Sequence, residues 1–170
     1  MHRTALRFIA LLAPVALASW AGAESTVTIS KTHLCCNNCV NGANKAVSSV
    51  AGAKAKCDKD AGTIEITAPD EATAQKAVDA LAAAGYYGKA TGAKMTDDSG
   101  AKAGSVPSTE VSGIHNCCNK CTTTINDTIK KAGGRGKAAS KATTFTVTGP
   151  LDPVKLVEAF NDAGFSVKVK

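Results

Sequence analysis

Two copies of one short pattern of cysteine and histidine constrain this chain more than any other feature of its sequence. The first copy is His33-Leu34-Cys35-Cys36-Asn37-Asn38-Cys39, and the second is His115-Asn116-Cys117-Cys118-Asn119-Lys120-Cys121. The similarity continues beyond the motif, because Ala-Gly-Tyr at 84–86 corresponds to Ala-Gly-Phe at 163–165. A repeat of this kind indicates that one structural unit was used twice.

The first residues have the composition of a secretory leader. Two arginines introduce an apolar run at 8–20, which is followed by the small residues Ala21-Gly22-Ala23. A membrane anchor is the alternative, but a helix needs about 20 apolar residues to span a bilayer, and this run is shorter and contains Pro14. We therefore expect a cleaved signal peptide at 1–23, a periplasmic or secreted protein, and no membrane span in the mature chain.

Hydrophobic periodicity predicts the same order of elements, β-α-β-β-α-β, in units at 25–91 and 108–170. In the first unit we expect strands at 26–32, 54–57, 63–67 and 86–91, one helix after Cys39, and a second helix with Asp70 as its N-cap. In the second unit we expect strands at 109–114, 137–140, 144–148 and 165–169, one helix after Cys121, and a second helix at 153–163.

The composition between and around these units excludes some classes of function. Residues 92–107 are rich in Gly, Ala, Ser, Lys and Asp, which predicts a flexible linker. The formal net charge is only +6, and basic and acidic residues are mixed along the chain. We therefore expect no nucleic-acid partner.

The clusters themselves predict a soft-metal site. Two cysteines separated by two residues at the start of a helix converge easily on one ion, and the helix N-terminus favours the thiolate form. A third cysteine and a histidine directly before the pair offer two further donors. Three thiolates, with or without an imidazole, suit Zn²⁺, Cu(I), Cd²⁺ or Hg²⁺ and disfavour Mg²⁺ and Ca²⁺.

A strand, a Cys-x-x-Cys loop that opens the first helix, and the β-α-β-β-α-β order resemble the heavy-metal-associated domain. That family includes copper chaperones, the N-terminal modules of metal-exporting P-type ATPases and periplasmic mercury-binding proteins. The resemblance implies an α+β fold of two tandem ferredoxin-like βαββαβ domains. It also implies that the metal-binding pairs are Cys36 with Cys39 and Cys118 with Cys121, and that Tyr86 and Phe165 pack near the metal loops.

The motif also departs from the family pattern, which is Gly-Met-x-Cys-x-x-Cys. His33 and His115 replace the glycine, Leu34 and Asn116 replace the buried methionine, and Cys35 and Cys117 occupy the variable position. Because an acidic residue at that position can be a further ligand in zinc-type relatives, the resemblance allows the extra cysteines to do the same. We expect one soft ion per domain, Cu(I) or Zn²⁺, held by the following set: His33, Cys35, Cys36, Cys39, His115, Cys117, Cys118 and Cys121.

Two residue types remain open at this stage. The alternation of Val27 and Ile29 places His33 on the inward face, whereas a bulge near Lys31 would place Leu34 there, so each histidine is either a ligand or a buried structural residue. Cys57 lies on a predicted strand and has no counterpart in the second unit, which favours a buried apolar cysteine or an isolated thiol.

The function that fits these features is the capture or hand-over of a soft metal ion outside the cytoplasm, with a metal transporter or another metal-binding protein as partner. The alternative is a thiol-disulfide redox protein or a disulfide-stabilised adaptor, because exported cysteines meet an oxidising environment. A thioredoxin-like enzyme would need a larger sheet and a suitably placed proline. The sequence offers no other catalytic arrangement, so we expect no enzymatic activity.

Overall fold

The computed structural model describes residues 23–170. The expected signal peptide at 1–23 lies outside the described residues, apart from its last residue. Within the described part of the chain, no helix combines the length and the apolar character that crossing a membrane would require.

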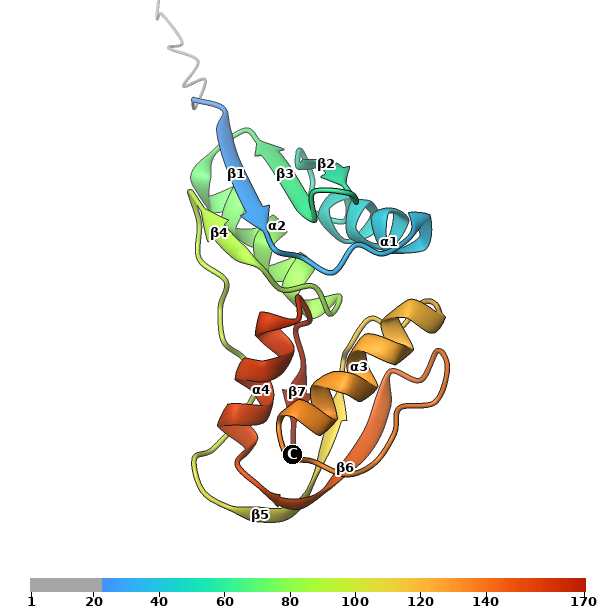
Figure 1. Cartoon of the computed structure of the whole chain (residues 1–170). Coiled ribbons are helices and arrows are strands. Elements are labelled where there is room, and N and C mark those ends of the chain that lie inside the picture. Colours follow the sequence, from blue (N-terminus) through green and yellow to red (C-terminus); the bar gives the residue numbers. More distant parts are fainter. Residues whose placement is uncertain (1–22) are drawn as a thin grey trace, which may run out of the picture.

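The described chain contains four helices and two antiparallel sheets, which confirms the expected mixture of helices and antiparallel strands (Figure 1). In chain order the elements are β1 (Ser25–Ser30), α1 (Asn37–Ser48), β2 (Lys54–Asp58), β3 (Thr63–Ala68), α2 (Glu71–Ala83), β4 (Lys89–Thr91), β5 (Val106–Ser112), α3 (Asn119–Lys131), β6 (Thr144–Leu151), α4 (Pro153–Asp162) and β7 (Lys168–Val169). We call residues 25–91 the N-terminal half and residues 106–170 the C-terminal half.

The N-terminal half is built on a sheet with strand order β2-β3-β1-β4. Val27 and Ile29 alternate along β1 and lie opposite Ile66 and Ile64 of β3, and all four side chains are fully buried. The helices contribute buried residues at helical spacing to the same core, namely Ala43, Val47, Ala74, Ala77, Val78 and Leu81. The alternation on the strands and the apolar stripes on the helices thus meet in one packed layer.

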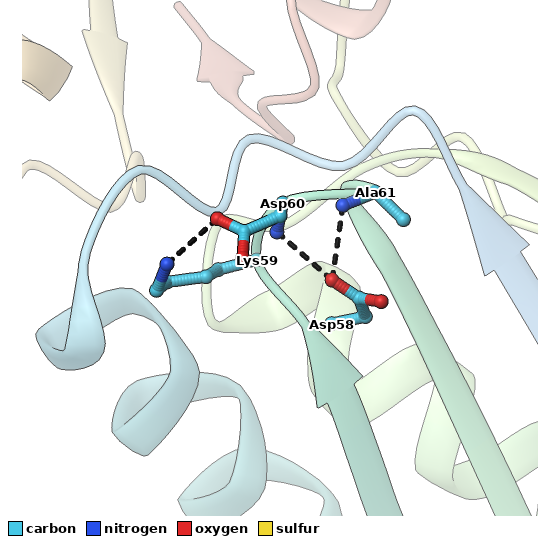
Figure 2. Close-up of polar contacts among 4 residues, drawn as sticks. All are labelled: Asp58, Lys59, Asp60 and Ala61. Carbon is cyan, nitrogen blue, oxygen red and sulfur yellow. Dashed lines mark hydrogen bonds and ion pairs between the residues drawn. The ribbon is translucent and has the colours of Figure 1, made fainter.

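A tight turn joins β2 to β3, and Figure 2 shows how it is held. The carboxylate of Asp58 accepts hydrogen bonds from the backbone N–H of Asp60 at 2.9 Å and of Ala61 at 3.0 Å, which is the usual way in which an aspartate fixes a turn. Directly after the turn, the carbonyl of Gly62 accepts a bond from the N–H of Thr32 at 2.9 Å. The hairpin therefore supports the loop that leads into the first cysteine motif.

The C-terminal half has a three-stranded sheet, with the order β6-β5-β7. The strand predicted at 137–140 is wrong, because the structure places only an isolated bridge nearby, between Arg135 and Thr148. The side chain of Asn126 instead satisfies the backbone of this segment: its amide donates to the carbonyl of Ala138 at 3.3 Å, and its oxygen accepts from the N–H of the same residue at 2.8 Å. A side chain thus replaces the strand partner.

The segment predicted as a linker, 92–107, makes hydrogen bonds to both halves. The side-chain amide of Gln75 forms two bonds with the backbone of Lys94, at 2.8 and 3.0 Å. The carbonyl of Ser99 accepts from the N–H of Val169 at 2.8 Å. Strand β5 begins at Val106, so the last two residues of the predicted linker belong to this strand.

The last strand of each half is shorter than the sequence predicts. Only 89–91 and 168–169 pair within their own sheets, although the alternation begins at 86 and 165. Tyr86 and Phe165 instead form an antiparallel bridge with each other. This contact joins the loop after α2 to the loop after α4, and Figure 1 shows these two loops next to each other between the two halves. The first residues of each expected strand therefore bind the other half.

Candidate metal centre

Each cysteine motif lies at the junction of a loop and a helix. Cys36 and Cys118 are the N-cap residues of α1 and α3 and have extended backbone angles. Cys39 and Cys121 lie in the first turns of these helices and are fully buried. The free N–H groups and the dipole of each helix start therefore face the cysteines and stabilise negative charge on sulfur.

The conformation of the loop before the first motif determines which residue of the motif points into the core. Lys31 has φ 61°, which breaks the alternation of β1. As a result Leu34 is buried, at 4% exposure, and belongs to the hydrophobic core. Of the two possibilities that the sequence left open, the structure therefore has the second, in which a break in the strand at Lys31 places Leu34 in the core.

Asn116, the counterpart of Leu34, is equally buried, but its side chain forms hydrogen bonds. Its amide donates to the carbonyls of Ala139 at 2.9 Å and Ala142 at 3.0 Å, and its oxygen accepts from the hydroxyl of Thr122 at 2.7 Å. The buried side chain of Asn116, in the second motif, thus holds the loop at 138–142, which has no strand partner.

The two motifs, although 82 residues apart, meet at the boundary between the two halves. Sulfur atoms of different motifs lie as close to one another as those within one motif. The shortest contacts between motifs join Cys39 to Cys117 at 3.2 Å and Cys35 to Cys118 at 3.3 Å. The other contacts are Cys35–Cys121 at 3.4 Å, Cys36–Cys117 at 3.6 Å, Cys39–Cys121 at 3.8 Å, Cys35–Cys39, Cys36–Cys39 and Cys117–Cys121 at 3.7 Å, and Cys118–Cys121 at 3.8 Å.

These contacts form a symmetric pattern. Exchanging the motifs turns the Cys35–Cys39 contact into Cys117–Cys121, and both measure 3.7 Å. The same exchange turns Cys35–Cys121 into Cys117–Cys39, at 3.4 and 3.2 Å. We call the six residues together the sulfur cluster. Its symmetry shows that the two motifs approach it in the same way.

The spacing in the sulfur cluster fits metal coordination better than disulfide bonding. All the contacts are much longer than the S–S bond of about 2.05 Å, and the six cysteines are free thiols. Four sulfurs at about 2.3 Å from a tetrahedral zinc ion lie about 3.8 Å from one another, which is the upper end of the observed range. Several groups of three ligand atoms within 4.8 Å of one another occur here, including Cys36 with Cys39 and Cys117.

The sulfur cluster cannot hold a full set of thiolates without compensating positive charge. Burial raises the pKa of Cys35 to about 12 and also raises that of Cys117. In the buried centre, a hydrogen bond from the Cys121 thiol lowers the pKa of Cys39, and the same contact raises that of Cys121. The cluster therefore retains protons, and metal ions that bind all the sulfurs must displace them.

Cys118 has a pKa near neutrality. The backbone N–H of Cys121, in the first turn of α3, lowers the pKa of Cys118 to about 7. Cys118 is also only half-buried. A half-buried thiolate at the rim is a suitable first contact for an incoming ion.

His115 is held mainly by backbone groups of the N-terminal half. Its Nδ1 lies 2.7 Å from the carbonyl oxygen of Gly85, and its Nε2 lies 3.2 Å from that of His33. The ring also stacks on Tyr86, with centroids 4.1 Å apart. Because both ring nitrogens face carbonyl oxygens, His115 would have to give up one of these contacts to bind a metal through nitrogen.

His33 is placed differently. Burial lowers its pKa, and its Nε2 is buried without a hydrogen-bond partner among the described residues. The ring stacks on Phe165 of the other half at 4.5 Å, and one ring nitrogen lies within 4.8 Å of the sulfurs of Cys35 and Cys121. A ring nitrogen of His115 likewise lies within 4.8 Å of the sulfurs of Cys39 and Cys121. Both histidines therefore lie beside the sulfur cluster, but within the described part of the chain only His33 has a buried ring nitrogen without a hydrogen-bond partner.

Two glycines allow the halves to come this close. Gly85 and Gly164 follow α2 and α4 and have φ angles of 89° and 85°. A Cβ on Gly85 would overlap the backbone N of His115, and one on Gly164 would overlap that of His33. The sequence repeat Ala-Gly-aromatic contains both residues, each at a place after a helix where glycine is common for its backbone conformation alone.

Cys57 lies outside the sulfur cluster. Its thiol contacts the side-chain oxygen of Asn44 at 3.6 Å, and burial raises its pKa. It belongs to none of the groups of potential metal ligands among the described residues.

No protein-family model matches the sequence, and no curated protein matches it significantly. Among solved structures, the chain is similar to the solution structure of the N-terminal soluble domains of Bacillus subtilis CopA, with 16% identity. The match covers 88% of this chain and 95% of that chain, with a TM-score of 0.31. The two whole chains therefore do not superimpose closely.

Proposed function

We propose that this protein binds soft metal ions outside the cytoplasm and passes them on to another protein. The observation that carries the proposal is the sulfur cluster, in which every sulfur lies within 3.8 Å of at least two others. Unpaired thiols at this density, at two helix N-termini, form a site whose charge and softness suit Cu(I) or Zn²⁺. We expect two ions per chain.

The proposal includes a tandem architecture of two heavy-metal-associated domains. The N-terminal half supports it, because its element order and its sheet order β2-β3-β1-β4 are those of a ferredoxin-like unit. The C-terminal half supports it in part, because it retains the motif, both helices and three of the four strands. In this view the C-terminal half lost its second strand when Asn116 and Asn126 took over the hydrogen bonds of that segment.

Hand-over follows from the partial burial of the sulfur cluster. Cys39 and Cys121 are inaccessible, whereas Cys36 and Cys118 are half-buried at the rim. An acceptor thiolate can therefore attack an ion from the rim and replace one sulfur at a time, so that no bare ion is released. This is a binding function, and we propose no enzymatic reaction. The partner would be a metal transporter or another metal-binding protein, and the leader-like residues 1–23 support export.

The test is an anaerobic titration of the reduced protein with Cu(I), Zn²⁺ and Hg²⁺, together with elemental analysis of the protein as isolated. We expect tight binding of at least one of these ions. The variant Cys39→Ser should weaken binding strongly, whereas Cys57→Ser, which removes a thiol outside the cluster, should bind like the wild type. Equal effects of the two variants would contradict the proposal.

The same samples test the redox alternative. Contacts of 3.2 and 3.3 Å between thiols of different halves would also permit oxidation to disulfides. A count of free thiols in the protein isolated without reductant distinguishes the two functions. Six protected thiols that become reactive only after a chelator is added support metal binding. Stable disulfides and no affinity for soft ions after reduction would instead favour a thiol-disulfide protein.

A further inference from the structure

We propose that the two motifs form one binuclear centre, in which Cys39 and Cys121 bridge two metal ions and each ion takes sulfurs from both halves. This inference rests on the proposed function and specifies its site. It replaces one independent ion per domain with a single centre that exists only when the halves are docked.

The contacts divide the sulfur cluster into two overlapping sets of four. The first set is Cys35, Cys39, Cys118 and Cys121, with contacts of 3.3–3.8 Å between five of its six pairs. The second set is Cys36, Cys39, Cys117 and Cys121, with contacts of 3.2–3.8 Å between five of its six pairs. Each set approximates the sulfur tetrahedron of a four-coordinate ion, whose edges are about 3.8 Å.

The two sets share one edge, the contact of 3.8 Å between Cys39 and Cys121. These two sulfurs have the most neighbours in the cluster and are the two fully buried cysteines. Two tetrahedra that share an edge need six corners, which is the number of cysteines in the motifs. The shared sulfurs are therefore the bridging ligands, and the other four are terminal.

The division also explains why each motif carries a third cysteine. In a single Cys-x-x-Cys site, Cys36 and Cys39 would bind the same ion as an equivalent pair. In the binuclear centre, Cys36 and Cys35 are terminal ligands of different ions, and Cys39 binds both. Without Cys35, one ion would have only three sulfurs.

The docked arrangement of the halves is a part of the site. The carbonyl of Gly85 accepts from the N–H of Ser166 at 3.0 Å, and that of Gly164 accepts from Tyr87 at 3.2 Å. The rings of His33 and His115 stack on aromatic residues of the opposite half. These contacts hold the two helix N-termini against each other, so the sulfur tetrahedra can form before any metal binds.

Cadmium provides the test, because Cd²⁺ binds thiolates as Zn²⁺ does and is visible to X-ray absorption. Native mass spectrometry of the reduced protein with Cd²⁺ should show two ions per chain, and the absorption spectrum should show four sulfurs around each ion. Four sulfurs around each of two ions, supplied by six cysteines, require two shared sulfurs. Two ions with three sulfurs each would overturn the bridged centre and leave the proposed function intact, whereas no bound Cd²⁺ and no other soft ion would overturn both.

A matched pair of variants tests the assignment of roles. Cys36→Ser removes a terminal ligand and should retain two Cd²⁺ ions, one of them with three sulfurs. Cys39→Ser removes a bridge and should reduce the tightly bound Cd²⁺ from two ions to one. Circular dichroism of the metal-free variants identifies any loss of folding. Folded variants that bind Cd²⁺ identically would contradict the bridging role of Cys39.

Discussion

Substitution of Gly85 by alanine should separate the two halves without altering either motif. An added Cβ would overlap the backbone N of His115 and would lie 2.6 Å from the carbonyl oxygen of Gly113. Because these are backbone atoms of the other half, no side chain can rotate to make room. The variant must therefore either distort this loop or lose the docked arrangement.

The free energy lost when the halves separate follows from the contacts between them. Four hydrogen bonds join the halves at this point, from the N–H groups of Ser166, Tyr87 and His33 and from one ring nitrogen of His115, because a neutral imidazole has a single N–H. At about 1 kcal/mol each, with some retained in a distorted loop, their loss amounts to about 2–4 kcal/mol. The affinity for ions that need sulfurs from both halves should then fall by up to about a thousandfold.

Gly133 is a matched control for the strain that alanine itself introduces. It follows α3 as Gly85 follows α2, with φ of 78°, and a Cβ there meets no atom within 4 Å. Both substitutions incur about 1–2 kcal/mol for a left-handed alanine. Thermal unfolding should show a small loss of Tm from strain in Gly133→Ala and a larger loss in Gly85→Ala, and Cd²⁺ titration should show a loss of affinity only in Gly85→Ala. Equal Cd²⁺ affinity of the two variants would refute the reasoning.

Two further substitutions test the supports of the site, each by chemical denaturation of the metal-free protein. Asn116→Leu introduces the residue that the first motif has at this position, Leu34. It should lower the free energy of unfolding by about 2–3 kcal/mol, because the carbonyls of Ala139 and Ala142 lose their hydrogen-bond donor. An unchanged free energy of unfolding would show that other contacts hold this loop. Tyr86→Phe removes the hydroxyl that donates to the Cys39 carbonyl at 2.8 Å and should cost about 1–2 kcal/mol, and a smaller cost would mean that water replaces this bond.

Local patterns predicted the elements of the N-terminal half well. The alternation of Val27 and Ile29 matches their burial, and Asp70 caps α2 by accepting from the N–H of Thr73 at 2.6 Å, as predicted. These features depend on neighbours along the chain, which the sequence displays directly. The strand predicted at 137–140 failed because a distant side chain, that of Asn126, satisfies its backbone instead.

The residue types of the candidate site were visible in the sequence, but their arrangement was not. The repeat identified every cysteine of the sulfur cluster, yet the prediction of one ion per domain assumed that the motifs would act separately. Their convergence depends on long-range contacts, in particular the Tyr86–Phe165 bridge and the space left by Gly85 and Gly164. Periodicity within one unit carries no information about such contacts.

Cadmium-113 NMR can detect directly whether two ions share sulfurs between the halves. The reduced protein loaded with this isotope should give two resonances in the range of all-sulfur coordination. A two-dimensional cadmium–cadmium correlation spectrum should connect them, because a bridging sulfur transmits spin coupling between the two nuclei. Two sharp resonances without a connecting cross-peak would show that the ions occupy separate sites and would contradict the account.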